Sequence, residues 1–219
     1  MNRPLIPLVL ASALLAAAPF AASAQAAQPA AAATQGESAS KLVLDNSQRL
    51  LSTLESRRAE FTADRGKLQA FVASEFDKMF DRDYSARQVL GRHGRGASDA
   101  DVKLFADALA DSLMRRYGSS LLDFNTQLRV RVKSETPLPR GLGVKVSSEM
   151  LRQGGEPIPV DYLMRQTADG WRVFDVMVEG VSFVQTFRQQ FDTPLSRKPI
   201  REVAADLRAG RMQADAGTN

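Results

Sequence analysis

The sequence contains no cysteine and only one histidine, His93, among its 219 residues. Without thiols, the chain has no disulfide framework, no thiolate metal site and no cysteine nucleophile. One histidine is too few for a histidine-based metal site, and no Ser-containing elbow motif lies near it. We therefore expect no cofactor, no catalytic triad and a fold that rests on burial of apolar side chains.

The sequence also lacks an apolar run that could cross a membrane at its start. The run over residues 5–18 is shorter than the roughly 20 residues that a spanning helix needs. It follows Arg3 and precedes Ala22-Ser23-Ala24, which is typical of a cleaved secretory signal peptide over residues 1–24. Residues 25–40 are rich in Ala, Gln, Ser and Thr without apolar periodicity, which predicts a flexible leader.

Neither sign of charge is in strong excess. The chain has 29 Lys and Arg residues against 25 Asp and Glu residues, a formal net charge of +4. The basic residues are spread among acidic ones along most of the chain, whereas nucleic-acid binding needs clustered positive charge. The sequence therefore argues against a nucleic-acid partner.

Apolar residues recur at helical spacing in three segments of the first half of the chain. The first segment predicts one helix, and Ser98 and Asp101 form a capping-box-like start to the third. Between them, Asp81-Arg82-Asp83 is interpreted as a turn. The apolar residues are Val43, Leu50, Leu54 and Phe61 in the first segment; Leu68, Phe71, Val72, Phe76, Met79 and Phe80 in the second; and Val102, Phe105, Ala106, Leu109, Leu113 and Tyr117 in the third.

From residue 127 the apolar period changes to two, which predicts β-strands. Leu128, Val130 and Val132 alternate with the basic residues Arg129, Arg131 and Lys133, whose face we interpret as a solvated sheet surface rather than a docking site. Strands over 143–151, 158–165 and 171–179 follow, separated by Gly-Gly and Asp-Gly turns that favour antiparallel hairpins. In the last strand, alternation places Trp171, Val173 and Met177 on one face and Phe174, Val176 and Val178 on the other.

Two short helices are expected after the strands, one with Phe183, Val184, Phe187 and Phe191 on one side and one over 200–207. The tail over 211–219 is predicted to be flexible. Helices first and antiparallel strands later indicate an α+β domain over 41–210, with helices packed on one face of a curved antiparallel four-stranded sheet.

Two features leave other chemistry open. The loop over 91–96 offers backbone N–H groups with Arg92 and Arg95 to a phosphate, but it lacks the motifs of nucleotide-binding turns, so we interpret it as a connecting loop with His93 in solvent. Asp161, Asp175 and Glu179 lie on or beside apolar strands, where a buried carboxylate can act as the general base of an isomerase or hydrolase. The structural alternative is that Asp175 bonds a neighbouring strand or helix end and Glu179 caps the next helix.

The segment over 169–183, DGWRVFDVMVEGVSF, resembles the hallmark segment of the MlaC family of periplasmic phospholipid shuttles, also called toluene-tolerance proteins. Other segments occur in the order that the family uses. Upstream lie Val89-Leu90-Gly91-Arg92, the helix with Phe105 and the strand over 157–162, and downstream lies the segment over 186–191. The resemblance covers roughly residues 42–207. One departure is His93-Gly94, where the family commonly has aromatic residues.

The resemblance implies an NTF-two-like cone with an apolar pocket for acyl chains, and no enzymatic reaction. It also implies a role in maintaining outer-membrane lipid asymmetry. The implied partners are phospholipid as cargo, the inner-membrane MCE-domain hexamer of an ABC transporter, and an outer-membrane lipoprotein–porin complex. A periplasmic adaptor whose apolar groove takes a partner helix is the other open hypothesis.

Apolar side chains of the second predicted helix and of the strands are the candidates for the pocket lining. Each buried methylene is worth about 0.8 kcal/mol, so acyl chains demand a dry lining. Val181 and Phe183, between the last strand and its following helix, are expected to flank the entrance. The expected lining residues are Phe71, Val72, Phe76, Val130, Val144, Val160, Tyr162, Val173 and Met177.

Overall fold

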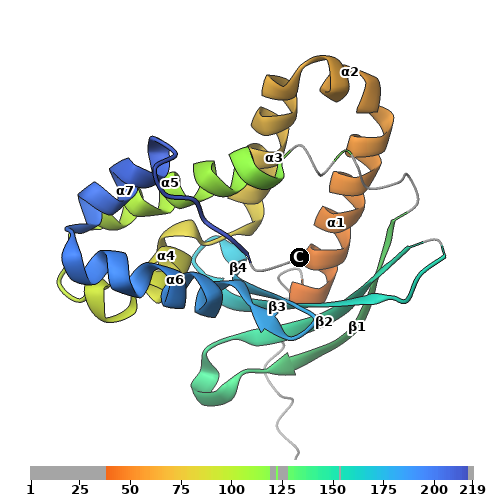
Figure 1. Cartoon of the computed structure of the whole chain (residues 1–219). Coiled ribbons are helices and arrows are strands. Elements are labelled where there is room, and N and C mark those ends of the chain that lie inside the picture. The colour runs from red at the N-terminus through yellow and green to blue at the C-terminus, as the bar shows by residue number, and fades with distance from the viewer. Residues whose placement is uncertain (1–37, 119–121, 123–127, 153, 217–219) are drawn as a thin grey trace, which may run out of the picture. The chain divides into compact units, whose positions relative to one another are not determined.

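The computed structural model describes residues 38–118, 122, 128–152 and 154–216. The chain divides into two units, residues 1–34 and 35–219, and the described residues all belong to the second. The predicted signal peptide and most of the predicted leader lie outside the described residues. Within the second unit, helices lie on one face and at one side of an antiparallel sheet (Figure 1).

Three helices open the described chain: α1 (Ala39–Ser56), α2 (Arg58–Ala63) and α3 (Arg65–Met79). The single helix expected through Phe61 breaks at Arg57, whose backbone leaves the helical region (φ −105°, ψ 17°). Helix α1 begins two residues before the expected start of the domain at residue 41, because the Ser38 side chain accepts a hydrogen bond from Lys41 N (3.2 Å) and caps the helix.

The segment expected as a turn and a connecting loop is instead largely helical. Asp81 caps helix α4 (Arg82–Leu90) by accepting a hydrogen bond from Tyr84 N (3.0 Å). Few apolar residues mark this helix, so its periodicity is weak in the sequence. A 3₁₀ turn, η1 (Gly91–Gly94), follows and leads to the long helix α5 (Asp99–Tyr117), which begins at the predicted cap Ser98.

The sheet has five antiparallel strands in the order β1-β2-β3-β4-β5. They are β1 (Arg129–Pro137), β2 (Val144–Leu151), β3 (Ile158–Thr167), β4 (Gly170–Val178) and β5 (Val181–Ser182), with the 3₁₀ turn η3 (Pro139–Gly141) between the first two. The expected fold class is confirmed, with one strand more than expected. Strand β5 has two residues, too few for an alternating pattern, and joins β4 through Glu179 and Gly180, both at positive φ (51° and 82°).

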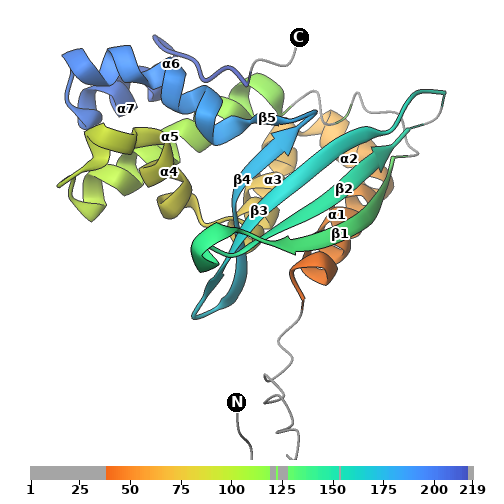
Figure 2. The same cartoon turned by 90° about the horizontal axis from the view of Figure 1, so that it is seen from below.

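The helices form two main apolar cores and one smaller cluster at the α1–α2–α3 end, rather than one layer. Helices α1 and α3 cover one face of the sheet, whereas α4, α5, α6 (Phe183–Arg197) and α7 (Ile200–Arg208) pack on one another beside β4 (Figure 2). Phe105 and Phe191 meet edge to face at the centre of this second core, with ring centroids 5.5 Å apart. Burial of both rings joins α5 to α6.

Residues 211–216, expected to be part of a flexible tail, lie against α5 and α6. Ala214 and Ala216 are buried in the helical core. Ala214 N donates to Ser112 Oγ (3.0 Å) and Asp215 N donates to Gln190 Oε1 (3.1 Å). Nothing in the sequence indicated this docking, because alanine produces no clear apolar period.

A register shift in β4 changes which residues share a face. Leu163 pairs with Asp175 and Met164 pairs with Val173, so Phe174 is the extra residue of a β-bulge. The prediction that Val173 and Met177 share a face is therefore wrong. Val173 lies on the side of α1 and α3, and Met177, which pairs with Asp161, lies on the opposite side.

Candidate functional site

An apolar layer lies between the sheet and the helices α1 and α3. Six buried side chains form its centre, and partly buried neighbours that include Val144, Tyr162, Trp171 and Val176 pack against them. The layer joins residues from β2, β3 and β4 to residues from both helices. Its buried members are Ala39, Val43, Met79, Val146, Met164 and Val173.

The strand register places most of the expected lining residues on the sheet face that meets this layer. Val144 pairs with Met164, and Met164 pairs with Val173. Tyr162 lies between Val146 and Val176. Val130 pairs with Met150, and Val160 pairs with Ser148. Met150 and Ser148 lie on the same face of β2 as Val144, and directly paired residues share a face, so Val130 and Val160 also face this layer.

Polar groups within the layer have partners that keep it dry. Ser148, at 3% exposure, donates its Oγ–H to the Val160 carbonyl oxygen at 2.9 Å. Burial raises the pKa of the Tyr162 hydroxyl, although a hydrogen bond with the Ser47 side chain of α1 opposes this rise. Both hydroxyls are thus satisfied without water, which a lining for apolar ligands requires.

The helical candidates do not all join the same cluster. Phe71 and Val72 pack with a separate apolar group at the α1–α2–α3 end, formed by Leu54, Phe61, Leu68 and Leu122. The Phe71 ring stacks on Phe61 with centroids 5.5 Å apart. Phe76 instead stacks on Phe80, with centroids 3.8 Å apart, and Phe80 packs against the sheet layer. The structure thus extends the apolar surface along α3 from the sheet to its far end.

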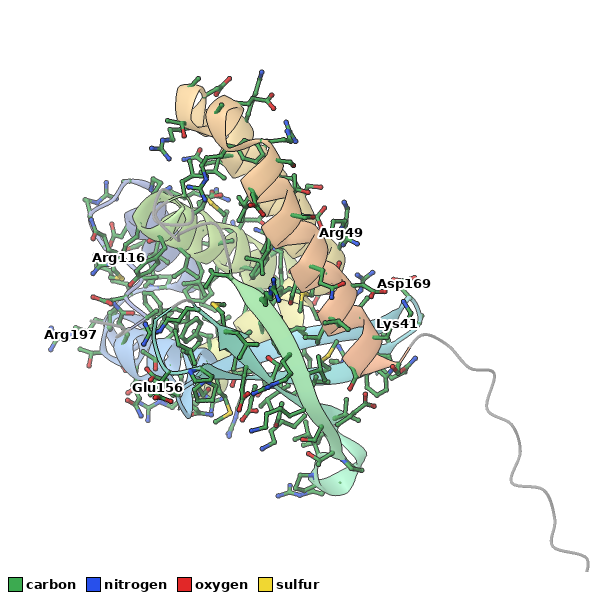
Figure 3. All side chains as sticks on the ribbon, turned by 90° about the vertical axis from the view of Figure 1, so that its right-hand side faces the viewer. Lys41, Arg49, Arg116, Glu156, Asp169 and Arg197 are labelled. Atoms are coloured by element: carbon green, nitrogen blue, oxygen red, sulfur yellow. The ribbon has the colours of Figure 1, made fainter. Side chains whose placement is uncertain are left out.

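A buried acidic residue between α1 and α3 was missed by the sequence analysis. Glu75 is only 9% exposed, and it accepts hydrogen bonds from Arg49 Nε (2.8 Å) and Lys78 Nζ (2.6 Å); Arg49 projects from α1 in Figure 3. Burial opposes ionisation, but the two cations hold the pKa of Glu75 below its ordinary value. A signal existed, because Glu75 interrupts the apolar stripe at four residues from Phe71.

Val181 and Phe183 lie where the sheet meets α6. Val181 on β5 is 50% exposed, one of two large apolar side chains in the described residues that are mainly exposed. Phe183, the first residue of α6, packs on the helical core and lies near Phe187, with ring centroids 6.1 Å apart. These two residues therefore adjoin the sheet without joining the apolar layer.

Asp175 connects β4 to the start of α6. It is 6% exposed, and it accepts hydrogen bonds from Ser182 Oγ (2.5 Å) and Val184 N (3.0 Å). This confirms the structural interpretation that Asp175 bonds a helix end. The expected cap at Glu179 is wrong, because Ser182 caps α6 by accepting from Gln185 N (3.0 Å).

His93 is not a solvated loop residue. Its Nε2 atom lies 2.9 Å from Asp192 Oδ1 on α6, and Arg92 donates to the other oxygen of the same carboxylate at 2.8 Å. Among residues that the structure describes, no group of His, Asp and Glu side chains is arranged to hold a metal ion. None of the helices in the described part has the length and apolarity needed to cross a bilayer.

Three comparisons agree on the kind of protein that this chain resembles. The profile of the MlaC protein family matches residues 44–209. Toluene tolerance protein ttg2D of Pseudomonas putida is 23% identical over 175 residues, which cover 76% of this chain and 80% of that protein. The phospholipid-binding protein from Ralstonia solanacearum, solved in complex with a phospholipid, matches with a TM-score of 0.69 at 20% identity over 78% of this chain and 97% of that one.

Proposed function

Because the chain belongs to the MlaC family, we propose that it is a phospholipid carrier that holds acyl chains between its sheet and the helices α1 and α3. The observation that supports this proposal is the apolar layer on one face of the sheet, in which the polar groups Ser148 and Tyr162 are already bonded. A carrier must offer acyl chains an interior as dry as the membrane that they leave.

The lining follows from the strand register. Val130, Val144, Val160, Tyr162 and Val173 face the helices and would contact acyl chains along the sheet. Phe71, Val72 and Phe76 would extend this surface along α3. Met177 faces the other side of the sheet and is left out of the proposed lining, whereas Val181 and Phe183 remain the proposed flanks of the entrance.

The free energy of acyl-chain burial sets the scale of binding. At about 0.8 kcal/mol for each methylene, two chains of about sixteen carbons correspond to roughly 25 kcal/mol of hydrophobic transfer. The free energy of burying the acyl chains must be nearly the same in the carrier as in the membrane if lipid is to be exchanged between them. Headgroup contacts at the entrance then need to supply only the preference among lipids.

Family membership favours a carrier over an enzyme. The general-base hypothesis rested on carboxylates such as Asp175, but both of its oxygens accept hydrogen bonds from the α6 start. The adaptor hypothesis predicts a bound peptide or subunit in the same apolar layer and no lipid. The identity of the bound molecule therefore separates the two proposals.

We further propose that the chain works in the periplasm. There it would move phospholipid between the inner-membrane MCE-domain hexamer of an ABC transporter and an outer-membrane lipoprotein–porin complex, and so help to maintain outer-membrane asymmetry. The similarity to a toluene tolerance protein and the signal-peptide pattern of residues 1–24 support this placement. Transfer of labelled lipid from carrier to either purified complex tests it.

The first experiment is native mass spectrometry with organic extraction on protein purified from the periplasm without detergent. We expect about one phospholipid for each chain. Protein that is empty, and that also takes no lipid from vesicles, would contradict the carrier proposal. Recovery of a peptide in place of lipid would support the adaptor.

A further inference from the structure

A hollow of about 320 Å³ lies at one end of the helical core, where η1 and the start of α5 meet the connection between α6 and α7. Figures 1 and 2 both show these segments at the end of the helices that points away from the sheet. The hollow is therefore separate from the apolar layer. Its lining includes His93, Arg95, Gly96, Asp101, Ile200 and Arg201.

Positive charge exceeds negative charge around this hollow. Arg201 is paired with Asp101, and Arg92 and His93 share Asp192. In the described part of the chain, no acidic side chain bonds the exposed guanidinium of Arg95. Among the residues that line the hollow, the arginines Arg95 and Arg201 face one carboxylate, Asp101, which leaves one unbalanced positive charge.

The shape of the hollow suits a small oxyanion. Its volume is roughly ten times the ~30 Å³ that one water molecule occupies in the liquid, so a group of several heavy atoms fits. Gly96 has a φ of 76°, and a Cβ atom there would meet nothing within 4 Å, so the backbone leaves open space beside Arg95. A guanidinium fork matches the oxygens of a phosphate group with two parallel hydrogen bonds.

We propose that this hollow binds a phosphate group, with Arg95 as the principal contact and Arg201 and His93 beside it. The phosphate has two sources with the same chemistry, a soluble phosphate and the headgroup of an anionic lipid in a membrane surface. The headgroup of lipid carried in the apolar layer is not the ligand, since that layer involves α1, α3 and the sheet, whereas the hollow is formed by η1, α5 and the α6–α7 connection. The inference goes beyond the proposed carrier function.

Isothermal titration of the mature chain with inorganic phosphate tests the first source. We expect Arg95→Gln to weaken phosphate binding by about tenfold, because hydrogen bonds to charged groups contribute on that scale. Among the described residues Arg95 has no side-chain partner to lose, so the variant should fold as the wild type does. The matched control is Arg65→Gln, an exposed arginine on α3, and it should bind phosphate like the wild type.

Flotation with vesicles tests the second source. Binding to phosphatidylglycerol vesicles but not to phosphatidylcholine vesicles, lost in Arg95→Gln and kept in Arg65→Gln, would assign the site to membrane headgroups. Phosphate binding without flotation would assign it to a soluble phosphate. Wild-type protein that binds neither, or an Arg95→Gln variant equal to wild type in both assays, would overturn the proposal. The mass of co-purified phospholipid should be the same in all variants, so failure here leaves the carrier proposal intact.

Discussion

Asp175 is the side chain through which the sheet is bonded to helix α6. Its two oxygens bond Ser182 and Val184, so a change there affects both the end of β4 and the first turn of α6. Such a residue is structural even though its burial and its place in a hydrophobic strand give it the appearance of a catalytic base. The distinction depends on the partners of its oxygens, which only the folded chain brings together.

Asp175→Asn should lower the free energy of unfolding by about 1–3 kcal/mol, because an amide replaces one charge-assisted acceptor with a donor next to the Val184 N–H or the Ser182 hydroxyl. Urea unfolding followed by circular dichroism measures the change. Asp169→Asn, in the exposed turn between β3 and β4, is the control and should be neutral. Equal stability of the two variants would contradict the structural role of Asp175.

The stability difference between wild type and Asp175→Asn should also depend on pH. Burial raises the pKa of the Asp175 carboxyl above its ordinary value, against the opposing hydrogen bonds from Ser182 and Val184. A carboxyl with a higher pKa in the folded chain stabilises the fold as pH falls into the interval between its ordinary and raised pKa. Wild type should therefore lose stability relative to Asp175→Asn as pH rises through that interval above about 4. A stability difference that is constant with pH in urea unfolding would show that Asp175 does not titrate there.

Val181→Glu tests the proposed entrance. The side chain is half exposed on β5, so a carboxylate there costs little folding free energy, yet it would place charge beside the path of acyl chains. We expect less co-purified phospholipid by native mass spectrometry, with an unchanged far-ultraviolet circular dichroism spectrum. Leu142→Glu, at a similarly exposed apolar residue in the turn between β1 and β2, is the matched control. Equal lipid content in both variants would remove Val181 from the entrance.

Among the elements, the segment 211–216 links two helices, α5 and α6. Its backbone is bonded by side chains of α5 and α6, and the Arg116 guanidinium reaches both Gln213 and Asp215 (2.9 and 2.8 Å). The buried methyl groups of Ala214 and Ala216 complete the helical core. The segment therefore stabilises the packing of α5 on α6.

Ala214→Asp should lower the unfolding free energy by about 3 kcal/mol, because a carboxylate would be buried in the helical core without a partner. The same change at Ala205, which is exposed on α7, should cost only about 0.5 kcal/mol from helix propensity. Thermal and urea unfolding measure both variants. A small and equal effect at both positions would mean that residues 211–216 do not hold the helices together in solution.

Cargo should contribute to the stability of the entire fold. A ligand that binds only the folded chain stabilises it by about 2.7 kcal/mol at a hundredfold excess over its dissociation constant. For a chain of this size, that corresponds to a rise in Tm of roughly 5–10 °C. Protein stripped of lipid should therefore melt lower than protein as purified and recover after incubation with phospholipid vesicles. Identical melting temperatures before and after stripping would argue against lipid in the apolar layer.

Much of the architecture was predictable from local patterns. The alternation of apolar and basic residues in β1, the Asp-Gly turn before β4 and the Ser98 cap of α5 each act over a few residues, and each was found where expected. Helix α4 and strand β5 were missed for the opposite reason. One has few apolar residues and the other has only two residues, so neither leaves a clear period.

The chain's composition and periodicity were enough to establish an α+β class, a meander of antiparallel strands and the lack of thiol chemistry. The resemblance to the MlaC family came instead from one specific segment, residues 169–183. These properties depend on residue types and on neighbours along the chain. Other features were decided only by the tertiary structure. They are the bulge at Phe174, the placement of Val173 and Met177 on opposite faces of the sheet, the partners of Asp175 and Glu75, and the docking of Ala214. Each arises between segments distant in the sequence, where close packing and the pairing of buried polar groups select one register and one set of partners.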